Sequence, residues 1–187
     1  MQKLIVFNSV TLDGYFTGPN GDLSWAHAKP DPEWDKFVAG NAKGGGTLLF
    51  GRVTYDMMVA FWPTPNAAKA FPDVAKGMNE AQKVVFSRTL DNSPWKNTRI
   101  VKDGMVAEVR KMKTAPGKGL TILGSGKIVS QLAGESLIDE YQLVVTPVAL
   151  GNGRTMFDGM KNKLGLKRTS AREFGNGNTF LTYIPAS

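Results

Sequence analysis

Residues 120–150 read Leu120-Thr-Ile-Leu123, then Gly124-Ser-Gly-Lys127, then an apolar-periodic run from Ile128 to Leu137, then Tyr141-Gln-Leu-Val-Val-Thr-Pro-Val-Ala-Leu150. This order is typical of a strand, a glycine turn, a helix and a second strand. A helix between two short β-rich runs predicts a right-handed crossover that joins parallel strands. We therefore expect an α/β sheet with a crevice where these strands end.

The turn from Gly124 to Lys127 has two interpretations. It would place backbone N–H groups at a helix N-terminus, where the helix dipole favours a phosphate, and glycines leave room for that phosphate to approach. Glycine also makes ordinary tight turns between strands and helices, and short motifs often match by chance. The loop alone leaves both readings open.

Composition limits the fold and the chemistry. The chain has 187 residues, of which 42% are hydrophobic and 21% are charged, and this suits one globular domain over residues 1–187. No apolar run approaches membrane-spanning length and the first residues do not resemble a signal peptide, so a cytoplasmic protein is expected. The chain has no cysteine and one histidine. This excludes disulfides and thiol catalysis, argues against a Ser-His-Asp triad, and predicts no metal site.

The formal charge of +7 raises the question of a nucleic-acid partner. Residues 96–127 carry eight basic side chains against two acidic ones, and a second basic cluster runs from Arg154 to Arg172. Stacking aromatics do not alternate with these residues, and no helix-turn-helix, zinc-finger or RNP pattern accompanies them. A solvated basic face is the favoured interpretation, an anionic small ligand comes second, and nucleic acid is the least favoured.

Polar residues follow the first strand of the chain. Lys3 to Val10 is apolar with little alternation, as in a strand covered on both faces, and Asn8 and Ser9 interrupt it near its C-terminal end. The Gly18–Trp25 segment that comes next is rich in glycine and is expected to be a loop, either a mobile lid or a static Ω-loop. Trp25 is large for an exposed loop and is expected to pack over another element.

Two further strands end in glycine, hydroxyl or basic residues. Thr47 to Phe50 leads into Gly51-Arg52-Val-Thr54 and a helix, where Thr54 either caps the helix or faces a ligand. Lys83 to Phe86 ends in Ser87-Arg88-Thr89. Since parallel strands end at the same edge of a sheet, these residues are expected to lie near the Gly124 turn.

The C-terminal part predicts a β-hairpin. Leu164 to Arg172 and Asn178 to Ile184 have strand patterns, and Gly175-Asn-Gly177 between them is a hairpin signal. The predicted fold is a three-layer αβα arrangement: a mostly parallel mixed sheet of about eight strands, with helices on both faces and a C-terminal antiparallel hairpin. The alternating strand from Thr179 to Tyr183 could leave an apolar face or an open edge, which predicts a homodimer.

Several segments together resemble one known superfamily. The chain is similar to dihydrofolate-reductase-like proteins, and within them to the RibD C-terminal domain, the reductase part of bifunctional riboflavin-biosynthesis enzymes. No Cys/His signature of a deaminase domain is present. The resemblance covers nearly the whole chain and rests on these segments in this order: Asn8-Ser9, Leu12-Asp13-Gly14, Trp25, Leu49-Phe-Gly51-Arg52-x-Thr54, Phe86-Ser87-Arg88, Leu123-Gly124-Ser125-Gly126-Lys127, Leu137-Ile-Asp139-Glu140, Thr146-Pro147-Val148, Leu150-Gly151-x-Gly153 and Phe157.

The resemblance implies an NADPH-dependent reductase of a small heterocyclic or ribosylamino-pyrimidine-like substrate. It implies that Asn8, Ser9 and Asp13 lie at the reacting centre. A hydride-transfer enzyme needs neither a nucleophile nor a metal from the protein, which agrees with a chain poor in Cys and His. By the same resemblance, the cofactor-binding residues are Gly51, Arg52, Thr54, Ser87, Arg88, Gly124, Ser125, Gly126, Lys127 and Ile128.

One departure bears on the substrate. Folate reductases place a carboxylate early in the helix after the Leu-x-Trp segment, and here Asp31, Glu33 and Asp35 are the alternatives. Asp31-Pro32-Glu33 is a common helix opening, so Asp31 is expected to cap the helix and the other two to face solvent. Dihydrofolate reduction is therefore the less favoured activity, and a nucleotide-binding module without catalysis is the alternative from another class.

Overall fold

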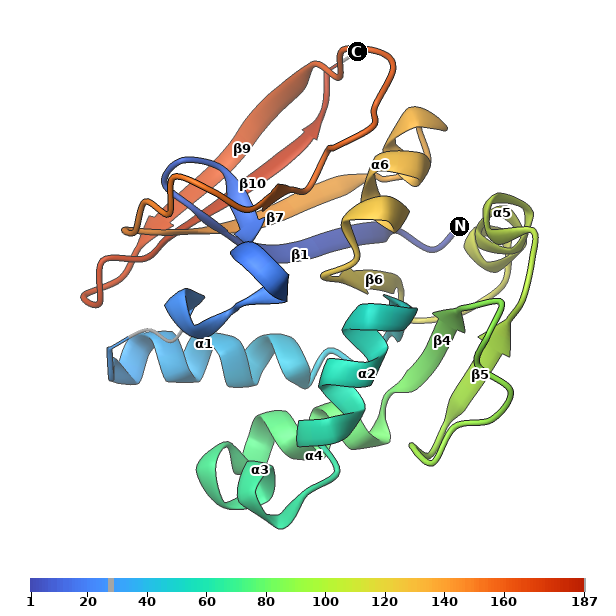
Figure 1. Cartoon of the computed structure of the whole chain (residues 1–187), viewed down its shortest axis with the longest axis horizontal. Coiled ribbons are helices and arrows are strands. Elements are labelled where there is room, and N and C mark those ends of the chain that lie inside the picture. The colour runs from blue at the N-terminus through green and yellow to red at the C-terminus, as the bar shows by residue number, and fades with distance from the viewer. Residues whose placement is uncertain (27–28, 187) are drawn as a thin grey trace.

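The computed structural model describes residues 1–26 and 29–186. Its main sheet has helices on both faces (Figure 1). The sheet has eight strands in the order β5-β4-β3-β6-β1-β7-β10-β9. Every neighbouring pair from β5 to β7 is parallel, whereas β10 is antiparallel to both β7 and β9. The predicted fold class is thus confirmed. The strands of this sheet are β1 (Leu4–Thr11), β3 (Thr47–Gly51), β4 (Gln82–Phe86), β5 (Thr98–Val101), β6 (Leu120–Leu123), β7 (Glu140–Thr146), β9 (Leu166–Glu173) and β10 (Thr179–Pro185).

The α-helices cover the two faces unequally. Their bounds are α1 (Pro32–Ala42), α2 (Arg52–Phe61), α3 (Pro65–Ala70), α4 (Pro72–Glu80), α5 (Met105–Thr114) and α6 (Gly126–Gly134). In Figure 1, α5 and α6 lie on one side of the sheet and the other four lie on the opposite side. Two of these helices follow each other closely, because Pro65 and Pro72 each begin one. No helix of the described residues is long and apolar enough to cross a membrane.

The stretch quoted first forms β6, α6 and β7 as predicted. The two strands are parallel but are not neighbours, because β1 lies between them and pairs with both. Val6 of β1, for example, stands beside Ile122 on one side and Tyr141 on the other. The first strand is therefore central, and its C-terminal end comes next to the glycine turn.

Side-chain alternation along the strands supplies a core on each face. On one face, fully buried Leu4, Val6 and Ile122 pack with Val109 of α5 and Leu132 of α6. On the other face, Phe50 and Val85 pack with Tyr55 of α2, Met78 of α4 and Trp95. Burial of large apolar side chains on both faces is what holds the three layers together.

The start of α1 is fixed by Asp31. Its carboxylate accepts hydrogen bonds from the N–H groups of Glu33 (2.8 Å) and Trp34 (3.1 Å), as predicted for an N-cap. The same side chain accepts from the N–H of Asn176 in the β9–β10 turn (3.0 Å). Trp34 packs on Phe174 at 5.1 Å between ring centroids, so the helix is tied to the hairpin twice.

The C-terminal hairpin forms as predicted, with Gly177 donating to the Phe174 carbonyl at 3.0 Å. The open edge belongs to β9 and not to β10, because β10 lies between β7 and β9. Most β9 side chains are exposed, and they include Lys167, Arg168 and Arg172. Charged side chains of this kind discourage edge-to-edge pairing of strands.

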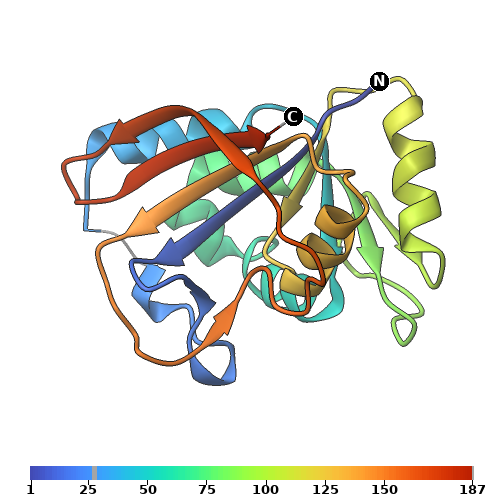
Figure 2. The ribbon, with the colours of Figure 1, turned by 90° about the horizontal axis from the view of Figure 1, so that it is seen from above.

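A second, two-stranded sheet was not predicted. β2 (Tyr15–Thr17) pairs antiparallel with β8 (Arg154–Thr155), and the sequence alone identifies no strand in either segment. Figure 2 shows this ribbon beyond the ends of β1 and β7. Strands of two and three residues are too short to show an alternating pattern, so their pairing depends on the fold that brings them together.

Candidate active site

The glycine turn after β6 is held by the end of β1. The Asn8 side-chain oxygen accepts from the Gly124 N–H at 2.6 Å, and its amide nitrogen donates to the Gly124 carbonyl at 3.2 Å and to the Met156 sulfur at 3.0 Å. Asn8 is only 6% exposed. Asn8, near the end of β1, thus orients the glycine turn. The next residue, Ser9, lines a cavity beside this turn.

A second set of hydrogen bonds joins the turns after β3 and β6. The Ser125 hydroxyl accepts from the Gly51 N–H at 2.7 Å and donates to the Thr54 hydroxyl at 3.0 Å. The Thr54 hydroxyl also accepts from the Ser125 N–H at 3.1 Å. Thr54 therefore does not cap α2, whose N-cap Gly51 provides no side-chain bond. The two predicted strand-to-helix turns form one rigid unit.

The two glycines of the turn are required by packing inside the protein. A Cβ on Gly124, which has φ of +62°, would lie 2.8 Å from the Thr54 side chain. A Cβ on Gly126 would lie 2.8 Å from the ring of Phe16 in β2. The prediction that these glycines leave room for a phosphate is incomplete, because protein atoms already occupy the space that a side chain would need.

The N-terminus of α6 is open to a ligand. Its N-cap is Ser125, with φ of +60°, and the Ser125 hydroxyl makes no capping bond. Among the described residues, no acceptor is found for the backbone N–H groups of Gly126 and Lys127. Free N–H groups and the helix dipole together favour an anion here.

A cavity of about 810 Å³ lies between the sheet and the helices α1, α2 and α4. It is lined by residues of the central strands, such as Phe7 and Ser9 of β1 and Gln142 of β7. None of the described residues that line it is an aspartate or glutamate. Its charged lining residues are all basic: Arg52, Lys118, Lys127 and Arg154.

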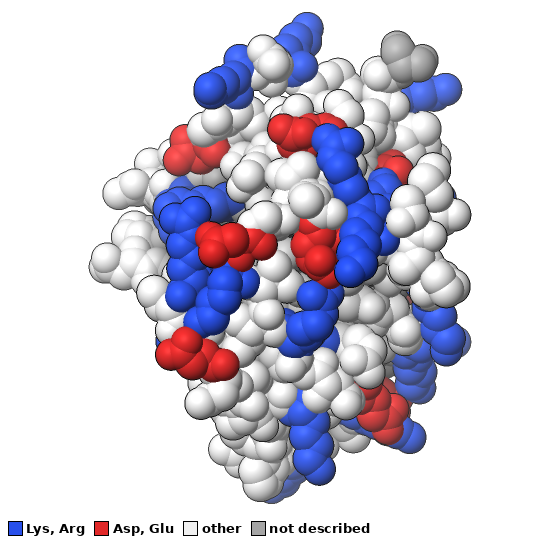
Figure 3. Space-filling model, turned by 90° about the vertical axis from the view of Figure 1, so that its right-hand side faces the viewer, with Lys and Arg blue, Asp and Glu red and all other residues white. Residues whose placement is uncertain are grey.

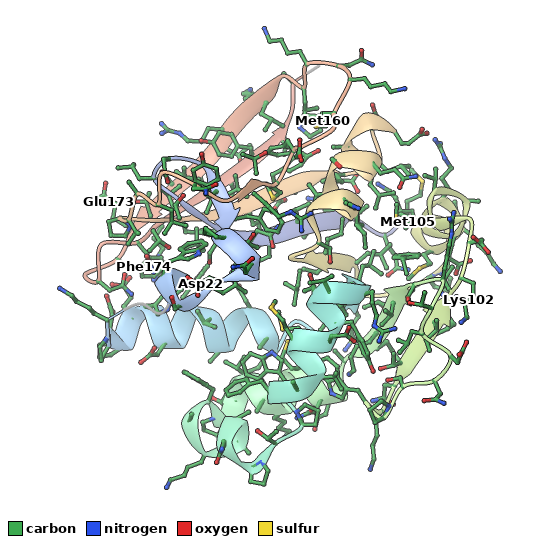
Figure 4. All side chains as sticks on the ribbon, in the orientation of Figure 1. Asp22, Lys102, Met105, Met160, Glu173 and Phe174 are labelled. Atoms are coloured by element: carbon green, nitrogen blue, oxygen red, sulfur yellow. The ribbon has the colours of Figure 1, made fainter. Side chains whose placement is uncertain are left out.

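A second cavity of about 910 Å³ lies at the ends of β4 and β5, beside the starts of α5 and α6. Ser87 and Arg88 line it, together with Lys102 and Arg110. Figure 4 places Lys102 and Met105 at the connection from β5 to α5, on the rim of this region. Lys102 was not predicted as a site residue, although it follows a strand end, the same signal that identified Ser87.

The two cavities share three lining residues, Arg52, Phe86 and Lys127. The Arg52 Nε donates to both carboxylate oxygens of Asp56, at 2.8 and 2.7 Å, which holds its side chain near the α6 N-terminus. Ile128 borders the second cavity. A single cleft therefore passes over the glycine turn, with basic groups at the junction. All ten residues predicted to bind the cofactor line one or both parts of it: Gly51, Arg52, Thr54, Ser87, Arg88, Gly124, Ser125, Gly126, Lys127 and Ile128.

Four of the eight basic side chains from residue 96 to 127 pair with acids, namely Arg99, Lys102, Arg110 and Lys113. Arg99 bonds Glu108 at 2.6 Å, and Lys102 bonds Asp91 at 2.6 Å. Figure 3, which shows this side of the molecule, has acidic side chains between the lysines and arginines. Exposed pairs of this kind are typical of a solvated face, and they leave no continuous basic stripe for a phosphate backbone.

The family follows from a comparison with known proteins. Residues 2–180 match the RibD C-terminal domain family. The chain belongs to this family. Two Bacillus subtilis (strain 168) proteins, the uncharacterized YyaP and YwjB, are relatives of this RibD C-terminal domain: YyaP is 29% identical over 97% of this chain and 94% of its own length, and YwjB is 24% identical over 93% of each.

Solved structures share the fold of this RibD C-terminal domain. A putative riboflavin biosynthesis protein from Shewanella sp. PV-4 has a TM-score of 0.73 at 23% identity, with all of both chains covered. A pyrimidine reductase-like protein from Corynebacterium diphtheriae has a TM-score of 0.67 at 11% identity, covering 100% of this chain and 92% of that one. A Thermotoga maritima diaminohydroxyphosphoribosylaminopyrimidine deaminase/5-amino-6-(5-phosphoribosylamino)uracil reductase has a TM-score of 0.66 at 14% identity, covering 99% of this chain and 57% of that one.

The acidic residues singled out from the sequence lie outside the cavity of this RibD C-terminal domain. Asp13 accepts from the Thr11 hydroxyl at 2.6 Å and from the N–H groups of Leu150 and Gly151, and these bonds lower its pKa, the Thr11 bond most. The backbone N–H bonds to Asp31, first that of Trp34, likewise lower its pKa. Glu33 pairs with Arg172 at 2.6 Å, and Asp35 is exposed. A role for Asp13 in a reaction stays a prediction.

The Gly18–Trp25 loop closes one end of the cavity. Gly21, Leu23 and Ala26 line the cavity, and Trp25 is buried, with its ring N–H donating to the Asp22 carbonyl at 3.1 Å. Figure 4 shows Asp22 above α1. Trp25 is thus a buried anchor of this loop, and this favours an ordered loop.

Proposed function

We propose that this RibD C-terminal domain is an NADPH-dependent reductase of a small heterocyclic substrate, of the ribosylamino-pyrimidine type. The observation that carries the proposal is the cleft whose two cavities meet at Arg52 and Lys127, beside the open N-terminus of α6. A dinucleotide phosphate has two ends joined by a pyrophosphate, and this cleft has two cavities joined at an anion site.

The residues present fit such a cofactor. The N–H groups of Gly126 and Lys127, with the Arg52 guanidinium, suit a pyrophosphate, since charge-assisted hydrogen bonds and a helix N-terminus both favour it. Ser87 and Arg88 in the second cavity suit the additional phosphate that distinguishes NADPH from NADH. When bound, the cofactor supplies the hydride, and the protein provides alignment and exclusion of water.

The first cavity, between the sheet and the helices α1, α2 and α4, favours a neutral or anionic substrate. Ser9 and Gln142 offer uncharged polar groups on its floor, and the surrounding wall is mostly apolar. The lack of an acidic group among the described lining residues disfavours dihydrofolate, because a protonated pterin needs an anionic partner when buried. Asn8 takes a positioning role in this proposal, since its amide is occupied by Gly124 and Met156.

The test is a fluorescence titration with NADPH and NADH, followed by an assay of NADPH oxidation with 5-amino-6-(5-phosphoribosylamino)uracil and with dihydrofolate. We expect NADPH to bind more tightly than NADH, and turnover with the pyrimidine alone. Absence of NADPH binding at millimolar concentration would overturn the proposal. Binding without turnover of either substrate would indicate the alternative, a nucleotide-binding module.

The proposal includes a homodimer and a cytoplasmic location. The support for a dimer is an exposed apolar group at the end of α2 and the start of α4, where Phe61 and Phe71 are 39% and 49% exposed. The location rests on the sequence prediction alone.

A further inference from the structure

The β2–β8 ribbon carries a buried hydroxyl that has no protein partner. The Thr17 Oγ1 atom is buried and makes no hydrogen bond within the described part of the chain, and Thr17 lines the first cavity. Three other described residues have a buried side-chain atom of this kind, and none of them lines either cavity: Thr98, Asn176 and Asn178. A buried hydroxyl without a partner is unfavourable, and one that faces a cavity is explained by a ligand that binds it.

Other polar side chains at the same end of the cavity already bind the protein. The Asn8 amide is occupied by the glycine turn and by the Met156 sulfur. The hydroxyls of Thr54 and Ser125 bond each other at 3.0 Å. These groups hold the turns in place, whereas the Thr17 hydroxyl is available to a molecule in the cavity.

The ribbon that carries Thr17 is held in place on both sides. Phe16, the preceding residue, lies against α6, since a Cβ on Gly126 would be 2.8 Å from its ring. Asp13, just before β2, accepts from the Gly151 N–H at 2.7 Å, in the segment that leads to β8. The Thr17 hydroxyl therefore has a fixed position, and a group that is already in position loses little entropy when it binds a ligand.

Arg154 stands beside Thr17 on this ribbon. The two residues are partners in the antiparallel register, so their side chains leave the same face of the ribbon. Arg154 also lines the first cavity, and it forms no ion pair with a described acidic residue. A guanidinium can only donate hydrogen bonds, and a threonine hydroxyl can donate one. Together the two side chains suit an acceptor oxygen of a ligand.

The nicotinamide half of the cofactor is the part that would pass this ribbon. The free N–H groups at the start of α6 suit the pyrophosphate, and Ser87 and Arg88 in the second cavity suit the additional phosphate, which belongs to the adenosine half. The nicotinamide half then extends into the first cavity. It passes close to Thr17, because Phe16 of the same strand lies against Gly126 in the first turn of α6. The strongest uncharged acceptor on this half is the carbonyl oxygen of its carboxamide.

We propose that the Thr17 hydroxyl, with Arg154 beside it, donates a hydrogen bond to the carboxamide oxygen of a bound nicotinamide and so fixes the orientation of the ring that gives the hydride. The proposal rests on the proposed function, since it requires a nicotinamide cofactor in this cleft. The hydroxyl that lacks a protein partner gains one from the cofactor. Fixing the ring in one orientation is the kind of alignment that a protein contributes to hydride transfer.

The test compares the binding of NADPH and two reduced analogues to the full chain by calorimetry. The thionicotinamide analogue has sulfur in place of the carboxamide oxygen, and the 3-acetylpyridine analogue keeps the oxygen but has a methyl group in place of the amino group. Since sulfur is a weak acceptor, we expect the sulfur analogue to bind about three- to tenfold less tightly than NADPH. The acetyl analogue should bind like NADPH. Equal affinity for NADPH and the sulfur analogue, or discrimination against the acetyl analogue alone, would overturn the proposal.

Three variants assign this discrimination to Thr17. Thr17→Val should abolish the discrimination against the sulfur analogue, whereas Thr17→Ser should keep it, because serine retains the hydroxyl. Thr155→Val is the matched control: it removes an exposed hydroxyl of the same ribbon that lines neither cavity, and it should behave as wild type. A Thr17→Val protein with the wild-type ratio of affinities would overturn the proposal.

The thermal midpoint without cofactor is a second readout, which separates binding from structure. Thr17→Val removes a buried hydroxyl that has no partner, so the midpoint should stay the same or rise while NADPH binds less tightly. A lower midpoint together with weaker binding would indicate a structural role for Thr17 and overturn the proposal. If the wild-type protein binds none of the three cofactors at millimolar concentration, the reductase function itself is wrong. Loss of the discrimination alone counts only against the role of Thr17.

Discussion

Arg88 is 85% exposed, and its partner Asp103 is 76% exposed, so their ion pair at 3.1 Å is weak and the guanidinium is free to bind a phosphate. We predict that Arg88→Ala weakens NADPH binding about three- to tenfold and leaves NADH nearly unchanged, because only NADPH carries the extra phosphate. Arg52→Ala should weaken both cofactors, since Arg52 lies at the junction of the two cavities. Fluorescence titration of each variant measures its affinities for NADPH and for NADH.

The control for Arg88 is Arg99→Ala. Arg99 is also an exposed arginine in an ion pair, but it lines neither cavity, so both affinities should stay as in wild type. Equal weakening of NADPH and NADH by Arg88→Ala would contradict the assignment of Arg88 to the extra phosphate.

Gly126 distinguishes two explanations of the glycine turn after β6: packing inside the protein and approach of a ligand. We predict that Gly126→Ala lowers the free energy of unfolding by about 1–3 kcal/mol and weakens both cofactors, because the new Cβ overlaps the Phe16 ring. A second change, Phe16→Leu, should restore stability and cofactor binding together. Denaturant unfolding and titration measure the two quantities. If the double variant regains stability but still does not bind the cofactors, then Gly126 is needed because the ligand approaches it directly.

At the scale of elements, Asp31 joins the start of α1 to the C-terminal hairpin. We predict that Asp31→Ala lowers the thermal midpoint clearly, and that Asp31→Asn lowers it less, because an amide oxygen still accepts from backbone N–H groups. Glu33→Ala is the control, since Glu33 makes only an exposed pair with Arg172. Circular dichroism melting measures the thermal midpoint of each variant and so gives their order of stability. An Asp31→Ala protein with the same thermal midpoint as the wild type would contradict this role of Asp31 in joining α1 to the hairpin.

The end of α4 depends on a buried lysine. Lys83 is 1% exposed and its ammonium donates to the carbonyls of Met78 (2.9 Å), Asn79 (3.2 Å) and Ala81 (2.6 Å). Burial lowers the pKa of Lys83 from 10.5 to about 8. Between these values the unfolded chain binds the proton and the folded protein does not, so this group makes the free energy of unfolding rise with pH.

We predict that Lys83→Met removes this rise between pH 8 and 10.5, as measured by denaturant unfolding at several pH values. Lys96→Met replaces an exposed lysine, and this variant should keep the rise in the free energy of unfolding. A wild-type protein whose stability stays constant over this window, or a variant that keeps the wild-type slope, would argue that Lys83 remains protonated.

At the scale of the whole molecule, the exposed surfaces decide how two copies would meet. The β9 edge carries Lys167, Arg168 and Arg172, so pairing two such edges would bring like charges together. The rings of Phe61 and Phe71 lie 6.4 Å apart on the surface and form an apolar contact area. We predict a homodimer through this area, which Phe71→Lys should convert to a monomer.

Sedimentation at micromolar concentration tests the dimer. Arg168→Glu, on the edge strand, is the control and should leave the dimer intact if the edge is not used. A wild-type monomer, or a dimer that survives Phe71→Lys, would contradict the prediction.

Local patterns account for the elements that sequence reasoning identified. The order of β6, α6 and β7, the Asp31 cap and the Gly175–Gly177 hairpin each depend on residues a few positions apart, where periodicity and turn chemistry act directly. The residues at strand ends were also predictable, because parallel strands end at one edge. The β2–β8 ribbon was missed, since neither strand is long enough to show alternation.

What the sequence by itself determined is the fold class, the family resemblance and the set of residues along the cleft. Only the tertiary structure decided what those residues do. Asn8 and Gly124 are 116 positions apart, Thr54 and Ser125 are 71 apart, and Phe16 of β2 meets Gly126 of α6. Contacts between distant segments leave no local signature in a single sequence, because they are fixed by burial and close packing in the folded chain.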